Sequence, residues 1–104
     1  MRLGTRMAVG FDQYFAESGV TQAQFRIMTA IWNIGQHDGA TPSALSDYLF
    51  IERATVSVLL KRMVANGLLS RRAEADRRSY RVRLTKKGGA TLMELLPRAR
   101  QVAN

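Results

Sequence analysis

The chain has 104 residues, of which 46% are hydrophobic and 23% charged, as is typical of one small folded domain. It has no cysteine, which excludes disulfides and thiolate metal sites. Its apolar runs are short, and no apolar segment follows the basic start of the sequence. We therefore expect neither a membrane span nor a secretory signal, and we expect a cytoplasmic protein.

The basic residues are concentrated in one part of the chain. Eleven of the sixteen Lys and Arg residues fall between Arg53 and Lys87, where only Glu74 and Asp76 oppose them. The formal charge of this third is therefore +9, eleven minus two, and that of the remainder is −1, five minus six. This concentration indicates a polyanionic partner.

Residues 1–35 are predicted to form two helices, the first of them within residues 1–18. Thr21 and Gln24 have the spacing of a capping box, which predicts the start of the second helix. Gly35 is expected to end that helix in a left-handed conformation. Apolar residues at helical spacing are expected in its core: Phe25, Met28, Ile31 and Trp32.

Two further helices follow, separated by a short turn. Thr41 is suited to the N-cap and Pro42 to the first position of a helix that is expected to end near Leu49. The next helix is expected to end at Gly67. Its predicted core stripe is Val56, Leu59, Leu60 and Met63. Its opposite face carries small and hydroxyl side chains, together with Val58, an apolar residue with no core to meet.

After Gly67 the period changes to two residues, which predicts a β-hairpin with strands Leu68–Glu74 and Ser79–Leu84. Thr85 is expected to cap a last helix, which Pro97 kinks or ends. The apolar positions of that helix are expected to be Leu92, Leu95 and Leu96. The predicted fold is mainly α with a small β-hairpin wing, a winged helix-turn-helix. In that fold the second helix of the motif enters the DNA major groove and the hairpin reaches a flanking groove.

The residues of this region resemble the MarR family of bacterial winged-helix transcription regulators. Asp76–Gly88 looks like the wing signature of that family, in which D-x-R precedes a V-x-L-T strand and a glycine. Leu45–Leu49, Ala54–Ser57 and Asn66–Leu69 resemble its helix-turn-helix core, in the same order. The resemblance covers roughly residues 19–88 and implies a homodimer that reads an inverted repeat in double-stranded DNA.

The resemblance also suggests a division of the chain. We expect residues 1–18 to form an N-terminal helix that is a partial dimerisation element, and residues 19–88 to form the winged helix-turn-helix DNA-binding domain. Residues 89–104 are expected to form a truncated C-terminal helix that lacks the family's final dimerisation helix. Aromatic and leucine residues of the two end segments would form a reduced dimer interface or cover the core of a monomer: Phe11, Tyr14, Phe15, Leu92, Leu95 and Leu96.

Carried over to this sequence, the family's wing roles fall on three neighbouring residues. Arg78 would enter the minor groove, Asp76 would hold it, and Arg77 would contact phosphate. Two positions depart from the family pattern: Phe50 stands where a glycine is usual, and Glu52 stands where a Ser or Thr cap is usual. The carboxylate of Glu52 suits a positive helix terminus but repels phosphate.

The expected DNA-binding residues form three groups. The recognition-helix group is Arg53, Ala54, Thr55, Ser57, Val58, Lys61 and Arg62. The wing group is Arg72, Asp76, Arg77, Arg78 and Arg81, and the first-helix group is Thr41 and Ser43. Ala54 and Val58 suit thymine methyl groups, whereas Lys61 suits guanine or the backbone. Thr55 and Ser57 suit base edges or phosphates. The remaining hairpin arginines, Arg71 and Arg83, are assigned to the general electrostatic field.

The function that we expect is sequence-specific regulation of transcription, with repression inferred from the family alone. A non-specific nucleic-acid binder and a winged-helix scaffold for protein binding remain the alternatives. Neither an enzyme nor a cofactor or metal site is expected, because one histidine (His37, in a polar loop) and no cysteine leave few catalytic combinations. Met28 and Trp32 are assigned to packing, with a small-molecule effector pocket as the alternative.

Overall fold

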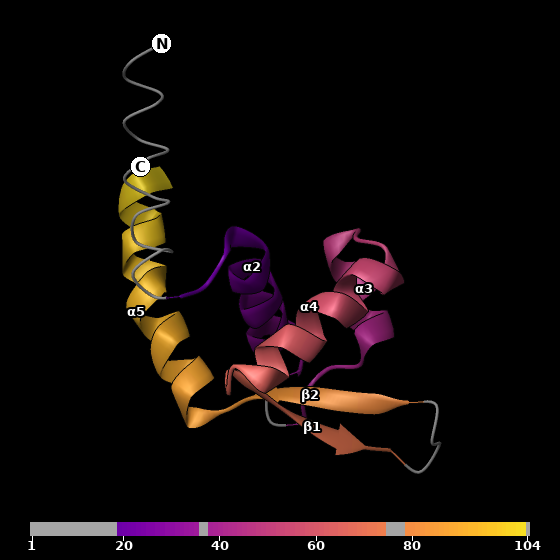
Figure 1. Ribbon diagram of the computed structural model, residues 1–104. Helices are drawn as coiled ribbons and strands as arrows, with labels where there is room; N and C mark the ends of the chain where they lie inside the picture. The colour runs from indigo at the N-terminus through magenta and orange to yellow at the C-terminus, as the bar shows by residue number, and fades with distance from the viewer. Residues whose placement is uncertain (1–18, 36–37, 75–78, 104) are drawn as a thin grey trace.

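The computed structural model describes residues 19–35, 38–74 and 79–103 (Figure 1). Its elements are α2 (Gln22–Ala30), the π-helix η1 (Ile31–Gly35), α3 (Pro42–Leu49), α4 (Arg53–Ala65), β1 (Leu69–Ala73), β2 (Tyr80–Leu84) and α5 (Lys86–Ala103). Figure 1 shows α2 and α4 between α5 on one side and α3 on the other, with the hairpin of β1 and β2 running beneath α4. The predicted winged helix-turn-helix, mainly α with a small hairpin, is confirmed.

The helix starts are set by local caps, as the sequence predicts. The Thr21 hydroxyl accepts from the Gln24 amide at 3.1 Å, and the Gln24 side chain accepts from the Thr21 amide at 3.2 Å. The Thr41 hydroxyl accepts from the Ala44 amide at 3.1 Å, with Pro42 at the first helical position. Each cap satisfies an amide that would otherwise have no partner within its helix.

A single apolar core joins all of these elements. Its fully buried large side chains are Ile27, Met28, Ile31, Leu45, Val56, Leu60, Met63, Leu69, Val82 and Leu92. The predicted stripes of α4 and α5 are confirmed at Val56, Leu60, Met63, Leu92 and Leu95, while Leu59 and Leu96 are partly buried against the same cluster. Because α2, α4, the hairpin and α5 share one core, the positions of α4 and the hairpin relative to each other are set by packing.

Two predictions at the end of α2 were wrong. Trp32 is 58% exposed, because the buried stripe is centred on Ile27 and Ile31 and the next residue along a helix lies about 100° away. Gly35 is not left-handed, because the helix continues through η1 up to that residue. The left-handed glycine is Gly39 (φ 82°), where a Cβ would lie 2.5 Å from the Val82 carbonyl oxygen.

The hairpin is antiparallel and has two distinct faces. Its register pairs Leu69 with Leu84, Arg71 with Val82 and Ala73 with Tyr80 on one face. The intervening pairs, on the outer face, are Ser70 with Arg83 and Arg72 with Arg81. The face that carries Leu69 and Val82 is turned towards the core, since both residues are buried. A backbone bridge between Ala40 and Val82, with hydrogen bonds of 3.0 and 2.9 Å, covers the free edge of β2.

Of the two effects predicted for Pro97, the end of the helix was wrong, because α5 continues from Lys86 to Ala103 with Pro97 inside it; a kink at Pro97 stays a prediction. A proline removes one backbone hydrogen bond, and the remaining turns of a long helix can hold the helical path. The predicted cap is confirmed: the Thr85 hydroxyl accepts from the Gly88 amide at 3.0 Å. In the part of the chain that the structure describes, no helix is long and apolar enough to cross a membrane.

The turn between α3 and α4 departs from ideal geometry. Phe50 adopts a left-handed conformation (φ 56°, ψ 43°) with its side chain 95% exposed. Glu52, the N-cap of α4, makes no side-chain capping hydrogen bond. The turn is held instead by Ser46, whose buried hydroxyl donates to the Ile51 carbonyl oxygen.

Candidate nucleic-acid interface

The exposed face of α4 is the first part of the candidate interface. All seven residues of the predicted recognition-helix group are exposed: Arg53, Ala54, Thr55, Ser57, Val58, Lys61 and Arg62. Val58 is 52% exposed, so its methyl groups are available on this face for contact with a partner. The buried Val56, Leu60 and Met63 hold the opposite side of the helix in the core. The exposed face therefore presents methyl, hydroxyl and basic groups on a rigid support.

A cleft of about 330 Å³ lies between the N-terminal ends of α3 and α4 and the hairpin. We call it the N-terminal cleft; its lining residues are Thr41, Pro42, Ser43, Arg53, Ser57, Ser79 and Tyr80. It brings both residues of the predicted first-helix group together with two of the recognition-helix group. Its lining provides several hydroxyl groups and one guanidinium without a carboxylate, a combination that suits phosphate oxygens.

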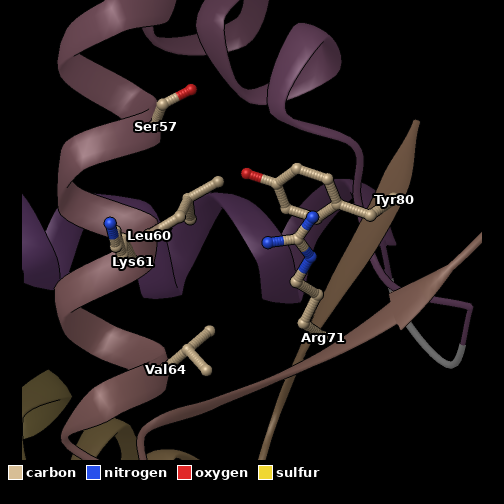
Figure 2. A pocket seen from close by; sticks show the side chains of 6 residues that line it. All are labelled: Ser57, Leu60, Lys61, Val64, Arg71 and Tyr80. Atoms are coloured by element: carbon tan, nitrogen blue, oxygen red, sulfur yellow. The ribbon is translucent and has the colours of Figure 1, made fainter. Parts of the chain in front are cut away.

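A second groove, of about 280 Å³, lies between α4 and the hairpin (Figure 2). We call it the hairpin groove; its lining residues are Ser57, Leu60, Lys61, Val64, Arg71 and Tyr80. Ser57 and Tyr80 line both cavities, so the two are neighbours along α4. Together they place three basic side chains, Arg53, Lys61 and Arg71, beside the exposed face of the helix.

Arg71 and Tyr80 form a stacked pair on the core-facing side of the hairpin. The guanidinium carbon of Arg71 lies 3.9 Å from the centre of the Tyr80 ring, a cation–π contact worth about 0.5–1 kcal/mol at an exposed site. In Figure 2 the guanidinium of Arg71 and the hydroxyl of Tyr80 both point from the hairpin towards α4. From the sequence alone, Arg71 is predicted to contribute to the general electrostatic field, and Tyr80 is predicted only as a strand residue. Their period-two spacing from Leu69 and Val82 was the signal that both share the inner face.

Of the predicted wing group, Arg72 and Arg81 lie among the described residues. Arg81 donates to the Glu74 carboxylate and, at 3.3 Å, to the Gly39 carbonyl oxygen, so its guanidinium also ties the hairpin to the preceding loop. Arg72 lies opposite Arg81 on the outer face and does not line either cavity. The remaining wing residues, Asp76, Arg77 and Arg78, lie outside the described residues, as does His37.

The described residues provide no candidate metal site. Within residues 19–35, 38–74 and 79–103, no cluster of three His, Asp or Glu side chains is placed to hold a metal ion. The basic, hydroxyl-rich surface around α4 is thus the feature with the most definite chemistry. It has the architecture of a winged helix-turn-helix, with a recognition-type helix flanked by a β-hairpin.

Comparison with known proteins agrees with this class. The family model described as MarR family matches residues 18–79. The HTH-type transcriptional repressor YetL of Bacillus subtilis is 30% identical over 87 residues, which are 83% of this chain and 52% of that protein. The chain spans about half the length of the curated relatives it matches. It belongs to the MarR family.

Solved structures give the same result. The regulator MosR of Mycobacterium tuberculosis, solved in complex with DNA, is 31% identical with a TM-score of 0.79, covering 98% of this chain and 72% of MosR. BpsR of Bordetella bronchiseptica, whose DNA binding is described as regulated by 6-hydroxynicotinic acid, is also 31% identical, with a TM-score of 0.79 over 98% of this chain and 71% of BpsR.

Proposed function

We propose that the chain is a non-enzymatic regulator of transcription that binds double-stranded DNA, with α4 in the major groove and the hairpin on the flanking backbone. The observation that carries this proposal is the exposed face of α4. It combines Val58 and Ala54, which suit thymine methyl groups, with basic and hydroxyl side chains that line two adjoining cavities. The +9 formal charge of residues 53–87 supplies the long-range attraction.

The binding mode that we propose divides the interface by role. Ala54 and Val58 are proposed to face base edges, and Lys61 is proposed to contact guanine or the backbone. Thr55 is proposed to contact either bases or phosphates. Arg62 is proposed to contact the backbone. In the N-terminal cleft, the residues proposed to bind one strand are Thr41, Ser43, Arg53 and Ser57.

For the wing, Arg78 is proposed to probe the minor groove with Asp76 holding it and Arg77 on phosphate. Arg72 and Arg81 are proposed to add attraction from the outer face, with Arg81 limited by its pairing to Glu74. A narrow, A·T-rich minor groove would favour Arg78 through its strong negative potential.

The finer parts of the proposal rest on the relatives. Repression is suggested by YetL, DNA binding by the MosR complex, and a small-molecule effector by BpsR. We extend these to this chain as a cytoplasmic homodimer that represses by binding an inverted repeat. A dimer doubles the contact area of a single winged module, which alone buries on the order of 600–1,000 Å² and binds weakly.

The test is selection from random duplex DNA at near-physiological salt, followed by binding assays on the enriched sequence. We expect an inverted repeat with half-sites about one helical turn apart. Val58→Glu should abolish binding to this sequence, because it buries a carboxylate against the bases without disturbing the core. Arg26→Gln, an exposed charge change on α2 away from both cavities, is the matched control and should bind nearly as wild type does.

Three other outcomes would contradict the proposal in different ways. Binding with a steep salt dependence but no enriched sequence would identify a non-specific nucleic-acid binder. No binding to duplex DNA, together with normal folding, would favour a winged-helix domain that binds protein instead. A folded Val58→Glu variant with unchanged affinity would remove α4 from the interface.

A further inference from the structure

The hairpin groove has a composition that the general binding mode does not explain. Lys61 and Ser57 stand on its α4 side, and Arg71 and Tyr80 stand on its hairpin side (Figure 2). None of its lining residues is acidic, so two cations face one space without a carboxylate in its lining. Two like charges across a groove raise its positive potential, and an anion that enters the groove lowers their repulsion.

The stacking of Arg71 leaves its hydrogen-bonding capacity available. A guanidinium that lies over an aromatic ring uses its flat face for the contact, whereas its N–H groups point outward in the plane. The guanidinium carbon of Arg71 lies over the Tyr80 ring at 3.9 Å from its centre, and Figure 2 shows the guanidinium turned towards α4. Planar, paired donors of this kind suit the oxygens of a phosphate group.

The hairpin groove is also large enough for a phosphate group and has an apolar part in its lining. Its volume of about 280 Å³ is several times the roughly 30 Å³ that one water molecule occupies, so a phosphate group fits. The half-buried Val64 provides an apolar part of the lining that the carbon atoms of a sugar can contact, whereas Leu60 is buried beneath it. The groove therefore suits a phosphate ester with an attached sugar better than a small hydrated anion.

We propose that the hairpin groove binds one phosphodiester of the DNA backbone, with Lys61 and Arg71 as the charged ligands. The hydroxyl groups of Ser57 and Tyr80 donate to the same phosphate, and Tyr80 also acts as the positioning residue for Arg71. The inference rests on the proposed function and extends it, because it makes the inner face of the hairpin a direct contact. In that case the inner face of the hairpin attracts DNA together with the arginines of its outer face.

The first test compares two arginines of the same hairpin. Arg71 and Arg83 are both exposed, but Arg83 follows the buried Val82 and lies on the outer face. Arg71→Ala and Arg83→Ala remove the same charge. With the enriched duplex, Arg71→Ala should lower the slope of log K against log salt by about 0.9 for each phosphate contact removed. Arg83→Ala should change the slope less. Equal changes in the two folded variants would overturn the proposal.

The second test locates the phosphate. Duplexes that carry a single neutral methylphosphonate are scanned across the enriched site. At one position in each half-site, the neutral linkage should weaken binding by wild type and Arg83→Ala but cause no further loss in Arg71→Ala. If every position weakens Arg71→Ala as much as wild type, Arg71 contacts no particular phosphate and the proposal is wrong.

Further variants separate the positioning role from a purely structural one. Tyr80→Phe keeps the ring under Arg71 and should keep the difference between the Arg71 and Arg83 variants, with a small loss of affinity. Tyr80→Leu removes the stacking surface and should lower the salt slope as Arg71→Ala does. Arg71→Lys keeps the charge but not the planar donors, so it should restore the slope without restoring the full affinity.

A final experiment distinguishes a groove that binds the DNA backbone from one that binds a free anion. It also distinguishes failure of the proposed function from failure of this inference. Inorganic phosphate alone is added to the protein while NMR signals of the hairpin are followed. Weak shifts at Arg71 and Tyr80 that DNA abolishes are expected, because inorganic phosphate carries the same charged oxygens but lacks the sugar. Saturation of the groove by inorganic phosphate with no loss of duplex affinity would assign the groove to a free anion and overturn its assignment to the backbone. Failure of wild type to bind any duplex would overturn the proposed function, and this inference with it. Normal duplex binding with equal Arg71 and Arg83 effects would overturn this inference alone.

Discussion

The two ends of α4 are held in opposite ways. At its C-terminal end, Gly67 takes a left-handed conformation (φ 80°), and side chains beside α5 bind the last carbonyl groups. Lys87 donates to the Asn66 oxygen at 2.8 Å, and Thr85 donates to the Gly67 oxygen at 2.5 Å. At its N-terminal end, a phenylalanine occupies the left-handed position and Glu52 provides no side-chain cap. One end is thus anchored by a residue suited to its backbone, and the other carries a conformational cost.

This difference shows where the sequence favours stability and where it tolerates strain. A left-handed conformation costs a residue with a side chain roughly 1–2 kcal/mol and costs glycine little. Phe50 gains little in return from packing, because its side chain is 95% exposed. The C-terminal end should therefore be sensitive to substitution, whereas the N-terminal end should allow improvement.

The largest effect is expected at Gly88, where α5 approaches the end of α4. A Cβ at this position would lie 2.0 Å from the Leu68 carbonyl oxygen, which is backbone and cannot move aside cheaply. Gly88→Ala should lower the free energy of unfolding by about 1–3 kcal/mol. Gly89→Ala is the matched control: no atom lies within 4 Å of its added Cβ, and it should stabilise the helix by about 0.5–1 kcal/mol. Chemical denaturation of both variants checks this, and similar values for the two would show that α5 does not touch α4 there.

A smaller effect of opposite sign is expected at Phe50. Phe50→Gly should raise the free energy of unfolding by about 0.5–1 kcal/mol, because relief of the left-handed strain exceeds the entropy that glycine adds to the unfolded chain. Phe50→Ala keeps a Cβ and should show no such gain. Thermal unfolding of the two variants measures the difference. A Phe50→Gly variant less stable than wild type would mean that the exposed ring makes a stabilising contact.

The smallest effect is expected at Lys87. Lys87→Met keeps most of the side-chain length but loses the hydrogen bond to Asn66 and a positive charge at the end of α4, and should cost about 0.3–1 kcal/mol. Lys86→Met removes the same charge from an exposed neighbour and should cost less. Denaturation at low and high salt distinguishes them, since the Lys87 effect should fall as salt screens the charge.

Features set by neighbouring residues were predictable from the sequence. The caps at Thr21, Thr41 and Thr85 depend on contacts three residues away, and all three are present. The change from helical to period-two spacing after Gly67 correctly predicted the hairpin; β1 is one residue shorter at each end than predicted, and β2 begins one residue later and ends where predicted. Each of these features depends on residues only a few positions apart, so the sequence predicts it without knowledge of the tertiary structure.

Features set by tertiary contacts were not predictable from the sequence. Trp32 was assigned to the core because helical spacing gives a stripe but not its centre, which depends on the elements that pack against the helix. The left-handed glycine was placed at Gly35 instead of Gly39, since the bridge to Val82 that requires it is remote in sequence. Likewise, period-two spacing puts Arg71 on the inner face, but only the packing of the hairpin shows that this face lines a groove beside α4. The roles of Asp76 and Arg78 stay predictions.

The exposed Trp32 gives the protein a built-in optical probe. It is the only tryptophan in the sequence and lies in η1, outside both the N-terminal cleft and the hairpin groove. Its neighbour Asn33 donates to the Tyr48 hydroxyl of α3 at 3.4 Å, so the indole lies next to a direct link between η1 and α3. Excitation of this indole reports on solvent around η1 and α3 and not on groups inside either cavity. A shift of its emission on adding DNA would therefore report a change outside both cavities.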